Sequence, residues 1–131
     1  MTMRHFTKLA VLATILLVAG CNSTPIANVS ETRVTTASSK TLSQDQVRAA
    51  IIRAASGLGW QIKDEGANKL IGSINLRTHS AEIEIPYSAT NYSIKYRSST
   101  NLGEMDGSIH KNYNGWIQNL NRGIATELSK L

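Results

Sequence analysis

Three runs of alternating residues decide the fold of this chain: Leu70-Ile-Gly-Ser-Ile-Asn-Leu-Arg77, Ala81-Glu-Ile-Glu-Ile-Pro-Tyr87 and Tyr92-Ser-Ile-Lys-Tyr-Arg97. Apolar residues recur at every second position, which is the period of a β-strand with one buried face. Turn-forming residues separate the runs, and a shorter alternating run, residues 60–63, precedes them. The pattern predicts an antiparallel meander of three clear strands and a short first one.

The two faces of this predicted sheet differ in character. One face carries Leu70, Ile74, Leu76, Ile83, Ile85, Tyr87, Tyr92, Ile94 and Tyr96. The other carries Arg77, Glu82, Glu84, Lys95 and Arg97. We expect the first face to be covered and the second to meet water. Opposite charges should face each other across the strands and help to fix the register, so a catalytic acid pair at Glu82 and Glu84 is not expected.

An amphipathic helix precedes the meander. Ser43-Gln-Asp-Gln46 matches a capping box, in which the serine and the glutamine satisfy free backbone N–H groups at a helix start. Apolar residues then repeat at helical spacing until Gly57 and Gly59 supply a stop. The sequence therefore predicts a helix over residues 44–57.

A second helix closes the chain. Its apolar stripe consists of Tyr113, Trp116, Ile117, Leu120, Ile124, Leu128 and Leu131. Its other positions are rich in asparagine and glycine, so its stability should come mainly from packing on the sheet. Together the elements predict a two-layer α+β domain in the order helix, antiparallel meander of three to four strands, helix, with both helices on one sheet face.

The N-terminus has the pattern of an export signal. Arg4 and Lys8 precede an apolar run over residues 9–19, which is too short to span a bilayer. A basic start, a short apolar segment and small residues at its end are typical of a cleaved signal peptide. We therefore expect residues 1–20 to be removed. The single cysteine, Cys21, cannot form an internal disulfide.

The end of this segment, Val18-Ala-Gly-Cys21, resembles the lipobox of bacterial lipoproteins. The resemblance implies cleavage between Gly20 and Cys21 and covalent attachment of lipid, palmitate included, to Cys21. It also implies anchoring to a membrane without spanning it. In that family an asparagine after the cysteine, here Asn22, favours the outer membrane on its periplasmic side.

Residues 21–41 are predicted to be a flexible tether. Of the twenty residues from 22 to 41, nine are Ser or Thr, and no apolar period is visible. Such a composition is typical of chain that buries too little surface to order itself. The single folded domain is accordingly expected to span residues 42–131.

Charge argues against nucleic acid as a partner. The whole chain has 14 Lys and Arg against 9 Asp and Glu. Removal of Arg4 and Lys8 with the signal leaves 12 basic residues, an excess of three. No basic stripe is present, and an exported protein does not meet nucleic acid.

The chemical candidates on the closing helix are weak. His110 and Lys111 stand at its predicted start, where they could attract an anion or, as we favour, cap the helix. Asn114, Gln118 and Asn121 form a stripe of amides that could bind glycan or peptide, or could simply be a solvated face. No catalytic set, metal-ligand spacing or cofactor motif is visible, and we expect none.

Three segments, Tyr92–Tyr96, Ser99–Leu102 and Ile109–Ile117, resemble a group of small, uncharacterised lipoproteins of Gram-negative bacteria. The resemblance covers about residues 42–131 and implies fold and location, but no activity. We expect a non-catalytic envelope lipoprotein that binds an envelope protein or peptidoglycan, or supports the wall. The alternative is an envelope enzyme or enzyme inhibitor that uses residues 98–114. The sequence leaves the oligomeric state open.

Overall fold

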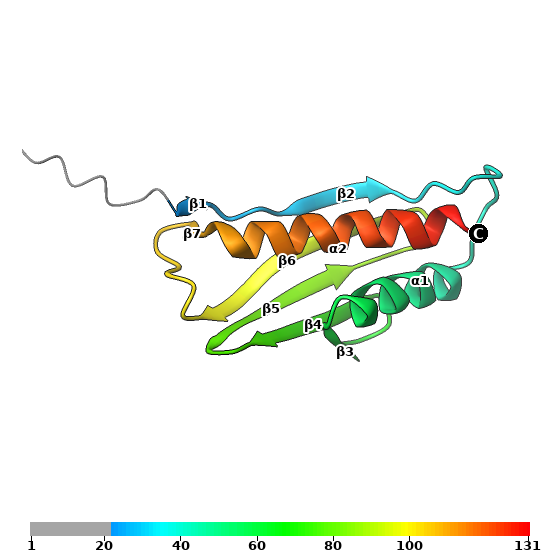
Figure 1. Cartoon of the computed structure of the whole chain (residues 1–131). Helices are drawn as coiled ribbons and strands as arrows, with labels where there is room; N and C mark the ends of the chain where they lie inside the picture. The colour runs from blue at the N-terminus through cyan, green and yellow to red at the C-terminus, as the bar shows by residue number, and fades with distance from the viewer. Residues whose placement is uncertain (1–21) are drawn as a thin grey trace, which may run out of the picture.

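The computed structural model describes residues 22–131. They form two helices, a five-stranded antiparallel sheet and a two-stranded sheet (Figure 1). The fold is therefore α+β, as predicted. The predicted signal peptide, with Gly20, and the predicted lipid-attachment residue Cys21 lie outside the described residues. Neither helix has the combination of length and apolar character that crossing a membrane requires.

The elements follow the chain in the order β1 (Ser23–Pro25), β2 (Val29–Arg33), α1 (Gln44–Gly57), β3 (Gln61–Asp64), β4 (Lys69–Leu76), β5 (His79–Pro86), β6 (Asn91–Thr100), β7 (Ser108–His110) and α2 (Lys111–Ser129). The large sheet has the order β2-β6-β5-β4-β3, and β1 pairs with β7 in the small one. Strands β3 to β6 each pair antiparallel with the next, so the predicted meander is present.

Helix α1 begins and ends as its sequence predicts. The Ser43 side chain accepts from the backbone N–H of Gln46, and the Gln46 side chain accepts from the backbone N–H of Ser43, which completes the capping box. At the other end Gly59 has a φ of +90°, a conformation that favours glycine. This turn lets the N–H of Trp60 reach the carbonyl of Ala55 at 3.0 Å, which satisfies a carbonyl that the helix leaves free.

One hydrophobic core joins the helices to the sheet. Its buried members include Val47, Ile51, Trp60, Leu70, Ile74, Ile83, Ile85, Tyr92, Ile94, Tyr113, Ile117, Leu120 and Ile124. Two predictions about the sheet faces are wrong. Leu76 is 45% exposed because it ends β4, beyond the covered part of the sheet. Ile71 lies opposite Glu84 on the face expected to meet water, yet it is only 1% exposed.

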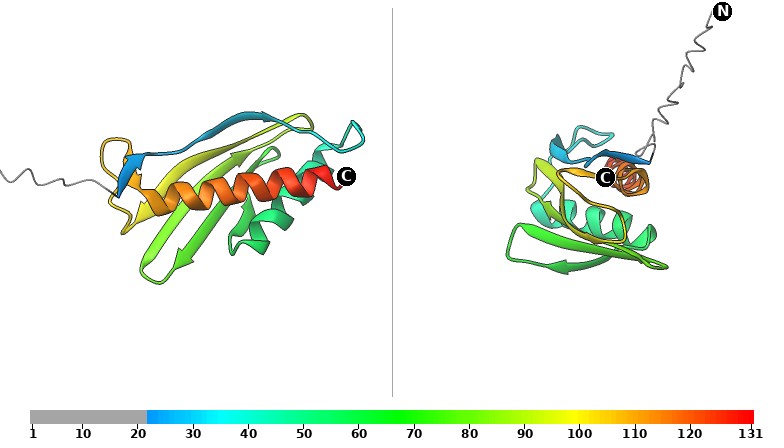
Figure 2. Two further views of the ribbon diagram at one scale, coloured as in Figure 1. Left: turned by 45° about the horizontal axis from the view of Figure 1, so that its top comes forward. Right: turned by 90° about the vertical axis from the view of Figure 1, so that its left-hand side faces the viewer.

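The N-terminal segment is part of the fold. Strand β1 pairs with β7, and β2 extends the large sheet beside β6. Figures 1 and 2 show these residues running along α2 from its N-terminal end. The prediction of a flexible tether over residues 21–41 is therefore wrong for Ser23–Arg33, and the folded part begins before Leu42. The composition misled because the partners of these strands lie 58 to 87 residues away.

The two tryptophans provide a matched test of this core. Trp60 is 3% exposed, whereas Trp116 is only partly buried. We expect Trp60→Ala to lower the free energy of unfolding by about 3–5 kcal/mol, the usual cost of deleting a buried aromatic side chain. Trp116→Ala should cost about half of that or less. Urea unfolding of both variants measures the difference, and equal losses would contradict the packing described here.

Candidate functional site

The residues predicted as a possible anion site, His110 and Lys111, lie where β7 meets α2. The His110 Nδ1 instead accepts a hydrogen bond from the backbone N–H of Asn112 at 3.2 Å and so caps the helix. Lys111 is exposed, and its backbone N–H donates to the carbonyl of Asn22 at 2.8 Å. Within residues 22–131 no Asp or Glu side chain is hydrogen-bonded to His110. Nothing in its contacts favours an enzyme or inhibitor site at residues 98–114.

Asn114, the first amide of the predicted stripe, is fully occupied in holding the N-terminal segment. Its Oδ1 accepts from the backbone N–H of Ala27 at 2.9 Å. Its Nδ2 donates to Thr24 Oγ1 at 2.9 Å and to the carbonyl of Pro25 at 2.8 Å. One side chain thus binds three residues that lie almost ninety positions earlier, and this amide is not available to a ligand.

The other two amides of the stripe differ from each other. Asn121 Oδ1 accepts a hydrogen bond of 2.6 Å from the hydroxyl of Tyr92, which ties α2 to β6. Gln118 is exposed and makes no side-chain hydrogen bond to any residue in the described part of the chain. The stripe is therefore mostly a set of structural contacts and does not form one ligand-binding surface.

A shallow depression of about 520 Å³ lies on the first turns of α2. It is lined by Thr24, Lys111, Asn112, Asn114, Gly115, Trp116, Gln118 and Asn119. Three of the predicted candidates, Lys111, Asn114 and Gln118, thus lie beside the partly buried Trp116. Asn114 and Thr24 are bonded to each other, whereas Lys111, Asn112, Gln118 and Asn119 are exposed and make no side-chain hydrogen bond to a described residue.

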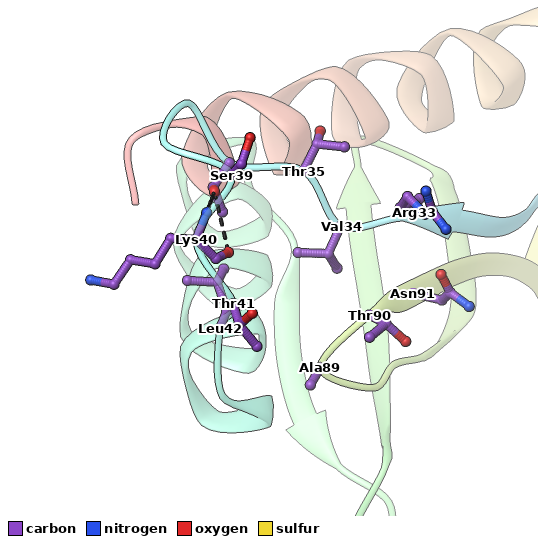
Figure 3. A pocket seen from close by; sticks show the side chains of 11 residues that line it. Arg33, Val34, Thr35, Ser39, Lys40, Thr41, Leu42, Ala89, Thr90 and Asn91 are labelled. Atoms are coloured by element: carbon purple, nitrogen blue, oxygen red, sulfur yellow. Dashed lines mark hydrogen bonds between the residues drawn. The ribbon is translucent and has the colours of Figure 1, made fainter.

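A larger cleft, of about 690 Å³, lies at the opposite end of the molecule and was not predicted. Its walls are Arg33, Val34, Thr35, Thr36, Ser39, Lys40, Thr41, Leu42, Ala89, Thr90 and Asn91. They come from the segment between β2 and α1 and from the turn between β5 and β6 (Figure 3). We call it the distal cleft, because β1 lies at the other end of the fold (Figure 1).

The walls of the distal cleft are held by defined hydrogen bonds. The backbone N–H of Val34 donates to the carbonyl of Thr90 at 2.7 Å and joins the two walls. In the loop, Thr36 Oγ1 accepts from the backbone N–H of Lys40 at 2.8 Å, and the N–H of Ser39 donates to the carbonyl of Thr36 at 3.2 Å. A side chain that bonds its own neighbouring backbone stabilises a turn, so the cleft has an ordered loop on one side.

The chemistry of the distal cleft is cationic and rich in hydroxyls. Arg33 and Lys40 belong to opposite walls, with the Lys40 side chain extending outward from the rim in Figure 3, and neither forms an ion pair with another described residue. None of the eleven lining residues is acidic. Val34 and the buried Leu42 supply apolar surface between them. Such a cleft is suited to a ligand that presents a carboxylate next to apolar and hydroxyl groups.

A cluster of charged side chains lies on the face of the large sheet that carries Glu82 and Glu84. Arg97 contacts Glu65 at 2.9 Å, Glu82 at 3.2 Å and Glu84 at 3.8 Å. Lys69 contacts Glu65 at 3.2 Å and Glu84 at 3.8 Å. The predicted pairing of opposite charges across the strands is present in these contacts. Glu82 and Glu84 each face a cation, so they form part of an ion-pair network.

The cluster also lowers one pKa. Hydrogen bonds from Arg97 and then Lys69 hold the pKa of Glu65 below its usual value. A carboxylate whose pKa falls on folding adds stability above its unfolded pKa, and that stability is lost as the pH drops through the folded value. These groups are solvent-exposed, so the ion pairs serve mainly to set the strand register.

Comparisons with known proteins gave no match from which a function could be proposed. No protein-family model, no curated protein and no solved structure matches the chain. Over residues 22–131 no group of three or more His, Cys, Asp and Glu side chains is arranged to hold a metal ion. Function is therefore inferred from the residues and their geometry.

Sequence reasoning missed the distal cleft because it assigned the cleft's loop wall to the tether. A usable signal was present. The run Val29-Ser-Glu-Thr-Arg-Val34 contains several β-branched residues, which favour strands. No local pattern could show that this strand would pair with β6, or that the loop after it would face Thr90.

Asn114 can be tested against a matched asparagine on the same helix. Asn119 is exposed and makes no side-chain hydrogen bond to a described residue. We expect Asn114→Ala to lower the free energy of unfolding by about 1–3 kcal/mol, because partly buried partners lose their hydrogen bonds. Asn119→Ala should change it by less than about 0.5 kcal/mol. Chemical denaturation measures both; similar values would show that Asn114 does not hold the N-terminal segment.

Proposed function

We propose that this protein is a lipid-anchored lipoprotein of the cell envelope, with residues 1–20 removed as a signal peptide and lipid attached to Cys21. We infer that it faces the periplasm, most simply from the outer membrane. One observation carries the proposal: the lipobox-like Val18–Cys21 is followed directly by Asn22, whose carbonyl is already bonded to Lys111. In this proposal the folded body is a non-catalytic binding or structural module.

We also infer that α1 and α2 cover the same face of the five-stranded sheet. The buried side chains of both helices share one core with those of the strands, and Figures 1 and 2 are consistent with this layout. The opposite face then carries the ion-pair network around Arg97 and stays open to water. This arrangement leaves the distal cleft, of about 690 Å³, as a concave surface for a partner.

The ligand that we infer for the distal cleft is an acidic peptide of the cell wall. Arg33 supplies a positive charge, the exposed Lys40 on the rim can supply a second one, and no acidic residue lines the cleft. Threonine and serine hydroxyls there can bond peptide groups or sugars, while Val34 and Leu42 can contact small apolar side chains. The stem peptides of peptidoglycan combine carboxylates, amides and alanine methyl groups, and they lie within the periplasm.

The anchor is tested at the cysteine. We expect the wild-type chain to incorporate labelled palmitate and to sediment with membranes. Cys21→Ser should incorporate none and should appear in the soluble periplasmic fraction, because two or more acyl chains are what hold such a protein stably. Unchanged membrane sedimentation of the variant, with no palmitate on the wild type, would refute the lipid anchor.

The cleft is tested by charge reversal with a matched control. We expect Arg33→Glu/Lys40→Glu to weaken co-sedimentation of the detergent-solubilised protein with purified sacculi by about tenfold or more, which corresponds to 1.4 kcal/mol. The control Lys63→Glu/Arg122→Glu changes the net charge equally, at exposed residues outside the cleft. Equal losses in both double variants would indicate non-specific charge attraction. No binding by the wild type would exclude peptidoglycan as the ligand.

A further inference from the structure

The folded body has no spacer at the end where Cys21 joins it. The carbonyl of Asn22 accepts from Lys111, Ser23–Pro25 pairs with β7, and the N–H of Ile26 donates to the carbonyl of Gly107 at 2.9 Å. A residue spans at most about 3.6 Å of extended chain. A lipid on Cys21 would therefore hold this end within a few ångströms of the headgroups.

Two other segments lie at the same end of the molecule. They are the turn between β4 and β5, Arg77–Thr78, and the loop 101–107 between β6 and β7. They are joined to each other, since Asn101 Nδ2 donates to the carbonyl of Thr78 at 2.8 Å and the His79 Nδ1 contacts the carbonyl of Asn101 at 2.7 Å. Figures 1 and 2 show the loop beside β7, and the turn at the same end of the sheet but farther from β1. We call residues 22–26, this turn and this loop the proximal end.

Exposed apolar side chains are concentrated at the proximal end. Three large apolar residues of the described chain are exposed: Met105 at 71%, Leu76 at 45% and Leu58 at 42%. Met105 is in the proximal loop, and Leu76 is the residue directly before the proximal turn. Only Leu58 lies elsewhere, after α1. Two of the three exposed apolar side chains thus lie at the end of the molecule that a lipid on Cys21 would hold against the bilayer.

The charges of this end do not favour a strongly charged partner. Arg77 and Lys111 are balanced by Glu104 and Asp106, which flank Met105. A surface that is close to neutral and carries protruding Met and Leu side chains is suited to the interface of a phospholipid bilayer. An acidic or basic protein partner would be expected to meet a surface of one sign.

We propose that the proximal end rests on the bilayer, with Met105 and Leu76 inserted among the lipid headgroups. The inference rests on the lipid anchor proposed above and adds a fixed orientation to it. The covalent lipid supplies the attachment, and the two side chains prevent the body from tilting freely. Helix α2, with 19 residues, then carries the distal cleft about 28 Å away from the membrane, facing the periplasm.

The experiment uses the lipidated protein in vesicles of phosphatidylethanolamine and phosphatidylglycerol. Since the thiol of Cys21 is consumed by the lipid, an introduced cysteine can be labelled alone with an environment-sensitive fluorophore. Met105→Cys and Leu76→Cys place the label at the proximal end, and Ser38→Cys, at an exposed position beside the distal cleft, is the matched control. Headgroup-attached spin labels serve as quenchers.

We expect blue-shifted emission at positions 105 and 76 and quenching at least threefold stronger than at position 38. Equal, water-like emission at all three positions in protein that floats with the vesicles would overturn the orientation and leave the anchor intact. Protein that fails to float with the vesicles would overturn the anchor and the orientation together. Strong quenching at position 38 with none at 105 would also overturn the proposal, because it would place the cleft against the lipid.

Discussion

The N-terminal segment is tied to the closing helix by the three hydrogen bonds of a single side chain. Asn114, on the second turn of α2, binds Thr24, Pro25 and Ala27. These contacts fix the N-terminal segment along the closing helix, with β1 paired to β7 on one side and β2 continuing into the large sheet on the other. Without them, β1 would still pair with β7 and β2 with β6, but Thr24, Pro25 and Ala27 would lose their bonds to α2.

Strand β2 covers the edge of the sheet that the meander of β3 to β6 would leave exposed at β6. The ten-residue strand β6 would otherwise present a long edge of free backbone groups, and such edges promote aggregation. An irregularity in β2 places Glu31 at a φ of +46°, and its N–H reaches the buried Ser93 Oγ at 2.9 Å. Ser93 is the one buried polar residue of the described core, and this contact satisfies it. Continuation of the same strand past Arg33 forms the wall of the distal cleft.

Local sequence patterns were enough to predict some of the elements but gave no indication of others. The capping box at Ser43 and the alternation of β4 to β6 involve neighbouring residues, so their positions were predicted closely. Strand β2 and the role of Asn114 depend on partners 58 to 90 residues away, and no short pattern encodes such a pairing. The amide stripe was visible, but whether an amide faces solvent or a neighbouring strand is decided only by tertiary packing.

The central claim is that the segment after Cys21 is folded and is not a flexible tether. Amide hydrogen exchange of the mature protein tests it most directly at Ala27, Glu31 and Val34, whose N–H groups donate to Asn114, Ser93 and Thr90. We predict slow exchange at all three, within a few fold of the β5 amides that lie in the centre of the sheet. Exchange at the rate of an unstructured chain at these three positions, with the β5 amides still protected, would contradict the account.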